Sequence, residues 1–299
     1  MPFVLFCYNR KWLDKGDGYM DIKLIALDLD GTLLNDQKEI DQPTIDALLK
    51  AQEKGISIAI ATGRSKGSIE FVSQPLHLYD GNNFVVGVNG QIIYDFANKE
   101  YFVDKVFDGY DAQKCMELGE KMGFEVTVCC GHDAYRYAPK AWRVPDSNEL
   151  MYEGAYADFG LKPFKRNTYD VFEVNEWIDK DVNKFVFRQS KEFFLENIET
   201  IRKCLPDYDV LMVGSTWIEV MPKGVSKASG LAYVANLLGI NAKNIMAFGD
   251  AENDIDMFNY VGYPIAMGNA MDNVKDIAYD VTDTNISNGI AKAIEKYIL

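Results

Sequence analysis

Short apolar runs alternate with amphipathic stretches near both ends of the chain. Strands are expected at 23–28, 56–61 and 84–88, with helices between them at 41–54 and from about 65 toward His77. After residue 226 the alternation returns, with helices expected at 227–238, 254–261 and 290–298 and strands at 244–248, 264–267 and 279–282. Strands that are apolar on both faces and alternate with helices predict a parallel sheet covered on both sides.

The middle of the chain has a different pattern. It contains a hairpin, a helix and two further strands, expected at 92–94 with 101–106, at 110–122, and at 124–130 and 134–137. An aromatic-rich stretch at 142–175 has no clear period. Beyond it we expect a strand, a helix and a hairpin, at 183–188, at 192–204 and at 209–213 with 217–220. These elements indicate a separate α+β unit.

The simplest fold that accommodates these elements is an α/β protein with a Rossmann-like, doubly wound parallel-sheet core and an inserted α+β cap domain. We assign residues 20–104 and 214–299 to the core and residues 105–213 to the cap. Residues 1–19 show neither a targeting pattern nor a helical period, so we interpret them as an N-terminal extension that is dispensable for folding and activity.

Composition and charge exclude several classes of protein. The 299 residues are 48% hydrophobic, which argues against disorder, and their net charge of −14 disfavours nonspecific binding to nucleic acid or an anionic membrane. Five cysteines without a CxxC pair and only two histidines disfavour a disulfide scaffold or a zinc site. We therefore interpret His77, His132 and the adjacent Cys129 and Cys130 as structural. No apolar run approaches the ~18 residues of a membrane span, and a reduced, cytoplasmic protein is expected.

Three of the expected strands end in polar residues. Asp28 and Asp30 follow the first strand, Thr62 follows the second, and Asp250 follows a strand near the end of the chain. Because ligands bind at the carboxyl ends of parallel strands, these groups should converge if the strands are neighbours. Clustered carboxylates without His or Cys repel one another unless a cation compensates them, and they suit Mg²⁺. A magnesium site points to phosphoryl chemistry, to which Lys227 could add positive charge.

Four segments resemble the motifs of the haloacid dehalogenase-like superfamily of phosphatases. They are DLDGTLL at 28–34, ATGR at 61–64, GVSKASGL at 224–231 and GDAENDIDMF at 249–258. Their order and the place of the insertion resemble the Cof-type, sugar-phosphatase-like branch, and so does Asn89-Gly90. Four ordered motifs are specific, whereas one alone is a weak signal.

The resemblance implies a two-step hydrolysis. Asp28 would be the nucleophile that forms an aspartyl-phosphate, and Asp30 would protonate the leaving oxygen and later deprotonate the water. Mg²⁺ would be held by the Asp28 carboxylate, the Asp30 backbone carbonyl and Asp250, with support from Asn253 and Asp254.

The resemblance also implies a phosphate-binding set. Thr62, Gly63 and Arg64 would bind the substrate, together with Lys227 and Asn253. Structural alternatives remain open at this stage. Thr62 could cap a helix, Lys227 could be solvated, and Arg64 could form a surface salt bridge. Asn253 or its neighbour could be only a helix cap.

We therefore expect a Mg²⁺-dependent phosphatase acting on a small phosphorylated metabolite such as a sugar phosphate, without a nucleic-acid or membrane partner. The alternatives are a phosphomutase of the same superfamily and a non-enzymatic, phospho-accepting signalling module. The acid-base residue Asp30 and the large insertion favour turnover over signalling. The cap should be mobile and set the substrate range, with Tyr135, Arg136, Trp142 and Arg143 as candidate residues.

Overall fold

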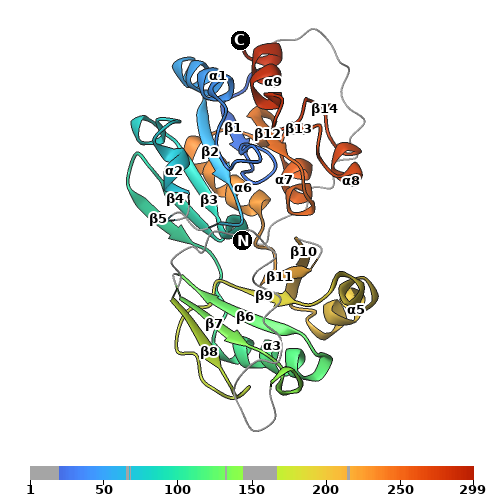
Figure 1. Cartoon of the computed structure of the whole chain (residues 1–299). Coiled ribbons are helices and arrows are strands. Elements are labelled where there is room, and N and C mark those ends of the chain that lie inside the picture. The colour runs from blue at the N-terminus through green and yellow to red at the C-terminus, as the bar shows by residue number, and fades with distance from the viewer. Residues whose placement is uncertain (1–19, 65–66, 68, 132, 144–166, 214–215) are drawn as a thin grey trace.

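A computed structural model of the chain contains two sheets, one above the other in Figure 1. The structure describes residues 20–64, 67, 69–131, 133–143, 167–213 and 216–299. The expected extension at 1–19, His132 and much of the aromatic-rich stretch at 142–175 lie outside the described residues.

The core sheet has eight strands in the order β14-β13-β12-β1-β2-β3-β4-β5. Their bounds are β1 Leu24–Leu27, β2 Ser57–Ala61, β3 Phe84–Gly87, β4 Ile92–Asp95, β5 Glu100–Val103, β12 Ile245–Gly249, β13 Tyr263–Ala266 and β14 Asp280–Val281. The six strands from β14 to β3 pair in parallel, and the hairpin of β4 and β5 adds an antiparallel edge. The α/β fold expected from the alternating apolar runs is confirmed.

Two pairs of helices pack on this sheet (Figure 1). One pair is α1 Gln42–Glu53 with α9 Gly289–Tyr297, and the other is α6 Lys227–Leu238 with α7 Ile255–Tyr260. A shorter helix, α8 Asp272–Lys275, precedes β14. The residues of β1, β3 and β12 are all buried, as expected for strands that are covered on both faces.

The helix expected to run toward His77 is much shorter than the sequence indicates. Among the described residues of this segment, α2 spans only Glu70–Ser73, and a 3₁₀ turn follows at Leu78–Asp80. Pro75 explains the early end, because it has no N–H to donate to a carbonyl of the preceding turn. His77 itself adopts a left-handed backbone conformation, with φ of 52°.

The second sheet forms the cap, with the strand order β10-β11-β9-β6-β7-β8. Its bounds are β6 Glu125–Cys130, β7 Asp133–Tyr137, β8 Asn167–Val171, β9 Lys184–Arg188, β10 Tyr208–Met212 and β11 Trp217–Pro222. Helices α3 Gly109–Met122 and α5 Lys191–Cys204 pack on one face, over a cluster that includes Phe185 and Phe187. Strand β8 comes from the stretch in which the sequence predicted no element.

The chain returns from the cap to the core later in the sequence than residue 214, where we expected the domain boundary. Strand β11 pairs with β10 and β9, so residues 217–222 belong to the cap sheet and not to the core. The turn after β11 contains Gly224 in a left-handed conformation, with φ of +79°. The Lys105 ammonium donates to the Lys223 carbonyl oxygen over 2.7 Å, which ties the two crossings together.

Candidate active site

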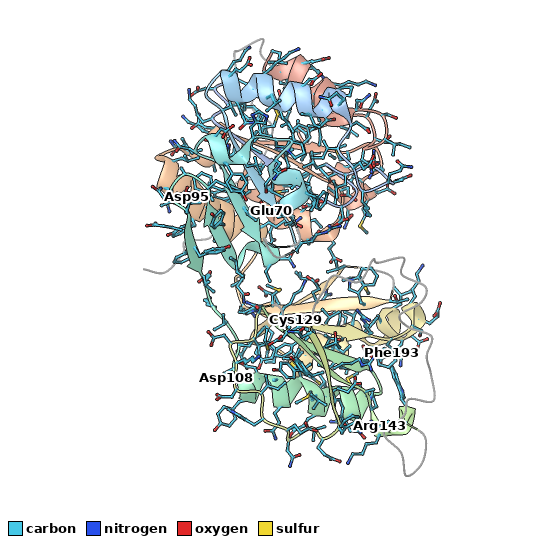
Figure 2. All side chains as sticks on the ribbon, turned by 60° about the vertical axis from the view of Figure 1, so that its left-hand side comes forward. Glu70, Asp95, Asp108, Cys129, Arg143 and Phe193 are labelled. Atoms are coloured by element: carbon cyan, nitrogen blue, oxygen red, sulfur yellow. The ribbon has the colours of Figure 1, made fainter. Side chains whose placement is uncertain are left out.

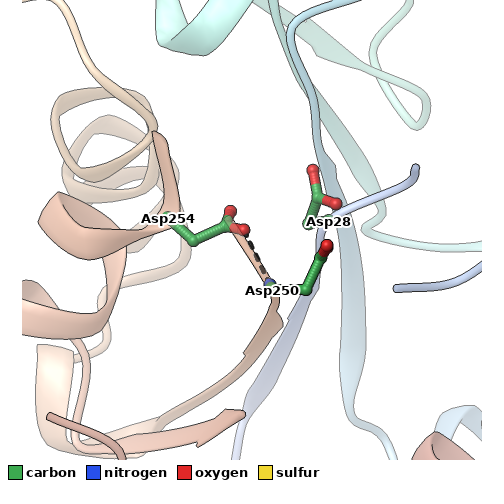
Figure 3. Close-up of side chains that lie close together, drawn as sticks. All are labelled: Asp28, Asp250 and Asp254. Carbon is green, nitrogen blue, oxygen red and sulfur yellow. Dashed lines mark hydrogen bonds between the residues drawn. The ribbon is translucent and has the colours of Figure 1, made fainter. Parts of the chain in front are cut away.

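The candidate site lies where three neighbouring core strands end. Strand β1 pairs in parallel with β12 on one side and with β2 on the other. Asp28, Asp250 and Thr62 follow these three strands, so the predicted neighbourhood of the strand ends is confirmed. Figure 3 shows the Asp28 and Asp250 side chains close together, with Asp254 facing them from the loop before α7.

Three carboxylates converge at this edge. Asp28, Asp250 and Asp254 each offer an oxygen atom, and these atoms lie within 4.8 Å of one another. Asp28 is 6% exposed and Asp254 is fully buried. Gly31, with φ of +87°, is part of the wall of this cluster, because a Cβ there would lie 2.5 Å from Asp250 Oδ2. A glycine is therefore required for both the backbone conformation and the space.

Lys227 neutralises part of this charge. It is the first residue of α6, and its Nζ atom donates to Asp28 Oδ1 over 2.5 Å and to Asp254 Oδ1 over 2.7 Å. Its side chain is fully buried, which excludes the alternative of a solvated lysine. Helix α6 comes close to the sheet at Gly230, where a Cβ would lie 2.4 Å from Val86.

Asp254 also organises the loop that carries Asp250. Its Oδ2 atom accepts hydrogen bonds from the backbone N–H groups of Asp250, over 2.9 Å, and Ala251, over 3.1 Å. It makes no side-chain cap to α7, so it is not simply a helix cap. The Thr32 hydroxyl donates to Asp250 Oδ1 over 2.7 Å and orients that carboxylate.

The electrostatics of the cluster follow from burial and crowding. Burial, helped by the neighbouring charges of Asp254 and Asp250, raises the pKa of Asp28 to about 8 against the opposing charge of Lys227. Burial likewise raises the pKa of Asp250 to about 6. Burial alone would lower the pKa of Lys227, but Asp254 and Asp28 outweigh it and hold that pKa above its ordinary value. Lys227 therefore stays charged, and a further cation at the cluster would favour the ionised forms of Asp28 and Asp250.

Asp30 lies outside this carboxylate cluster, contrary to the expectation that its side chain would join Asp28 and Asp250. Its carboxylate accepts from Arg64 Nε over 2.7 Å and Nη2 over 2.5 Å, and from Lys38 Nζ over 2.9 Å. Burial works against ionisation, but these hydrogen bonds and charges lower the pKa of Asp30. Arg64 therefore forms the salt bridge that the sequence left open as an alternative to substrate contact.

The other predicted residues lie around this edge. Thr62 is buried, and its hydroxyl accepts from the Arg64 backbone N–H over 3.1 Å, which stabilises a turn. The alternative that Thr62 caps the following helix is not supported, because the N-cap of α2 is Ile69. The Gly63 carbonyl oxygen accepts from Lys184 of the cap over 3.3 Å. The Asn253 amide nitrogen donates to Asn89 Oδ1 over 3.3 Å.

The structure shows the surroundings of the cap residues that we expected to set the substrate range. Arg143 is 9% exposed and donates to the carbonyl oxygens of Phe172 and Ala138, at the end of the cap away from the core in Figure 2. It is a structural residue, and the expectation that it contacts substrate is not supported. Arg136 is ion-paired with Asp170 across β7 and β8.

Tyr135 stacks on Tyr169 of the cap, with ring centroids 5.3 Å apart, and Trp142 lies in a 3₁₀ turn. Cys129 and Cys130 are buried and free of disulfide bonds, and His77 is exposed beside Asp80. Within the described part of the chain, no helix is both long and apolar enough to cross a membrane.

Sequence reasoning missed four residues of this region: Lys38, Asn89 as a side-chain contact, Lys184 and Glu219. Lys38 lies in a loop, and Lys184 and Glu219 lie on cap strands. The signal for Lys184 and Glu219 is a charged side chain beside apolar residues of a strand, in KFVFR and WIEVMP. Lys38 and Asn89 lie outside the strands and carry no such signal.

Comparison with known proteins agrees with this geometry. The model of a family described as haloacid dehalogenase-like hydrolase matches residues 25–294. A 5-amino-6-(5-phospho-D-ribitylamino)uracil phosphatase of Bacillus subtilis is 33% identical over 284 residues, covering 94% of this chain and 97% of that protein. A putative phosphatase of Streptococcus pyogenes is 28% identical, covering 94% of this chain and all of that protein.

Solved structures show the same fold. A phosphatase of the haloalkanoate superfamily from Bacteroides thetaiotaomicron superposes with a TM-score of 0.76 at 25% identity, covering 96% of this chain and 98% of that chain. A sugar phosphatase of subclass IIB superposes with a TM-score of 0.73 at 24% identity, over 92% of this chain and 98% of that chain, which supports the fold alone. The chain is thus an enzyme, a phosphoric monoester hydrolase, and it belongs to the Cof-type branch of the haloacid dehalogenase-like hydrolases.

Proposed function

We propose that this enzyme is a Mg²⁺-dependent phosphatase that hydrolyses a small organic phosphate monoester through a phosphorylated Asp28. The observation that carries the proposal is the cluster of Asp28, Asp250 and Asp254, with the fully buried Lys227 bonded to two of them. Three carboxylates share one ammonium group, so the site is built to hold a further cation.

The donor set fits magnesium. The cluster offers carboxylate oxygens without a nitrogen or sulfur ligand, which is the preference of a hard cation. Asp28 and Asp250 would hold the ion with the Asp30 backbone carbonyl, and Asp254 and Asn253 would support it. When bound, the ion would offset the negative charge of the transferring phosphoryl group and of the carboxylates.

Asp28 is the proposed nucleophile. One of its carboxylate oxygens would form a bond to phosphorus as the ester oxygen leaves, and water would then attack the phosphorus of the aspartyl-phosphate to release phosphate. The ion pair with Lys227 favours the ionised form of Asp28 against the effect of burial. The Thr62 hydroxyl and Lys227 would bind the phosphoryl oxygens, with Gly63, Arg64 and Asn253 around them.

Asp30 is the proposed acid and base for the two steps. It would give a proton to the leaving oxygen and later take one from the attacking water. In this structure Asp30 is held as a carboxylate by Arg64 and Lys38, so these contacts must loosen before it can donate a proton. A substrate phosphate near Arg64 would compete for that guanidinium.

The substrate proposed is a phosphorylated sugar, sugar alcohol or similar metabolite. The relatives named above include a phosphatase of a phosphoribityl compound, which supports this class. The test is phosphate release from sugar phosphates, phosphoribityl compounds and nucleotides, with Mg²⁺ and with excess chelator. We expect hydrolysis that depends on Mg²⁺. Transfer of the phosphoryl group to a second position of the sugar, without release of phosphate, would indicate a phosphomutase instead.

A further inference from the structure

A buried polar chain links the cap to the loops of the candidate site. Glu219 on β11 accepts a hydrogen bond from Asn89 Nδ2 over 2.6 Å and forms an ion pair with Lys184 on β9. Lys184 Nζ also donates to the Gly63 carbonyl oxygen of the core over 3.3 Å. Glu219 and Lys184 are each 7% exposed, and Asn89 is 1% exposed. Two charged cap residues are therefore buried against polar groups of the core.

Glu219 and Lys184 lie on the face of the cap sheet opposite its helices. Glu219 pairs with Val186, which is two residues from Lys184, so the two charged side chains share one face. Phe185 and Val220 point to the other face, into the cluster under α3 and α5. The charged pair therefore lies on the face that meets the core.

Cys129 confirms this orientation. It pairs with Lys184 across β6 and β9, and in Figure 2 it lies on the side of the cap toward the core.

Asn89 connects this pair to three loops of the candidate site. Its backbone N–H donates to the Thr62 carbonyl oxygen over 2.9 Å, and its Oδ1 accepts from Asn253 over 3.3 Å. The next residue, Gly90, packs so closely against Ser226, the residue before Lys227, that a Cβ there would lie 1.9 Å from the Ser226 carbonyl oxygen. A shift of the 89–90 turn would therefore disturb all three loops.

Burial of a carboxylate is costly unless it is paired and hydrogen-bonded. Lys184 belongs to the cap and stays with Glu219 wherever the cap lies, but Asn89 and Gly63 belong to the core. The chain of contacts is thus complete only when the cap is docked on the core. Docking in turn fixes the Asn89 side chain and the loops that it contacts.

We propose that Glu219, supported by Lys184, is a positioning residue through which the docked cap holds the phosphate-binding loops of the core in place. It acts through Asn89 and does not touch the substrate. This inference rests on the proposed phosphatase function, because the loops concerned are those assigned to phosphate and metal binding.

The kinetic test compares Glu219→Ala with a control, Glu120→Ala. Glu120 accepts a hydrogen bond from the Tyr137 hydroxyl within the cap and does not reach the core. We expect Glu219→Ala to lower kcat about 10- to 100-fold for every substrate, including p-nitrophenyl phosphate, with little change in KM, because misplaced loops slow the chemical step. Glu120→Ala should keep the wild-type kcat.

A second variant distinguishes the loss of the hydrogen bond to Asn89 from the loss of the negative charge of Glu219. The double variant Glu219→Gln with Lys184→Met keeps an oxygen that can accept from Asn89 and removes the ammonium that would otherwise be buried alone. It should recover most of the kcat that Glu219→Ala loses.

Hydrogen exchange in the absence of substrate supplies a readout that does not depend on activity. Backbone amides of residues 86–91 should exchange faster in Glu219→Ala than in the wild type, and not in Glu120→Ala. The inference would be overturned by unchanged exchange at 86–91, by a wild-type kcat in Glu219→Ala, or by a loss confined to the KM of larger substrates. If the wild type hydrolysed no phosphate ester, the proposed function would fail, and the exchange comparison would still decide whether Glu219 orders these loops.

Discussion

Lys227→Met tests the charge balance of the candidate site. The substitution keeps much of the volume of the side chain but removes the ammonium group that donates to Asp28 and Asp254. Asp28, Asp254 and Asp250 would then face one another with no positive charge among them. We expect the variant to lose phosphatase activity and much of its stability.

The size of the stability loss follows from the burial of the Lys227 side chain. Breaking a buried ion pair by removing one partner costs about 3 to 5 kcal/mol, and Lys227 is fully buried. At roughly 2 to 4 °C per kcal/mol for a chain somewhat smaller than this one, the melting temperature should fall by about 10 °C near neutral pH. An exposed pair provides the control, because Lys292→Met breaks only the surface contact with Asp283, worth about 0 to 1 kcal/mol.

The loss of stability in Lys227→Met should increase as the pH rises. Burial already raises the pKa of Asp28 to about 8 from 3.8, and removal of Lys227 raises it further. A carboxyl group with a raised pKa in the folded state adds stability that is full below its unfolded pKa and is lost as the pH rises through its folded pKa. Lys227 also lowers the pKa of Asp250, which is about 6. Because the two folded proteins differ only once these carboxyl groups ionise in the wild type, the deficit of Lys227→Met should be smaller near pH 5 and grow as the pH rises through about 6 and then about 8.

The assay is thermal unfolding of wild type, Lys227→Met and Lys292→Met from pH 5 to pH 9, followed by circular dichroism in the presence of a chelator. Equal melting temperatures for the wild type and Lys227→Met at pH 8 would refute the reasoning. So would a deficit that grows as the pH falls.

Further predictions concern single groups of the site. Asp30→Asn should lower kcat by about 10² to 10⁴, and the phosphorylated enzyme should accumulate, which intact-protein mass spectrometry after rapid quenching would detect. Arg64→Ala removes a group that lowers the pKa of Asp30, so the alkaline limb of the kcat profile, where Asp30 loses its proton, should move to higher pH; an unmoved limb would show that Asp30 is not the acid. Gly31→Ala places a methyl group 2.5 Å from Asp250 Oδ2, so Mg²⁺ affinity measured by calorimetry should fall sharply, whereas Gly55→Ala, which meets no atom within 4 Å at a similar φ, should leave it unchanged.

Much of the fold could be predicted from the sequence because the buried strands are short, apolar and bounded by clear turn residues. The same signal located Asp28 and Asp250, since residues after adjacent parallel strands must share an edge. It did not show where β8 lies, because the pairing of β8 with the distant β7 leaves little trace in local periodicity. Residues 217–222 were placed in the wrong domain because the boundary at 214 cut through a hairpin that the pattern had itself predicted.

The side-chain partners could not be predicted in the same way. Asp30 is only two residues from Asp28, but its carboxylate turns to Arg64 and Lys38, a choice made by side-chain geometry and by a lysine in a separate loop. Arg143 looked like a candidate for substrate binding because it is charged and lies beside aromatic residues. Its guanidinium instead donates to two backbone carbonyl groups of the cap, those of Phe172 and Ala138.

The most direct test of the central claim is phosphate release by purified Asp28→Asn compared with the wild type, in the presence of Mg²⁺ and with the best substrate from the screen. Asn keeps the size of the side chain, and circular dichroism would confirm that the variant is folded. The account predicts that Asp28→Asn releases no phosphate above the rate without enzyme, while the wild type turns over only when Mg²⁺ is present. Turnover by folded Asp28→Asn near the wild-type rate would contradict it.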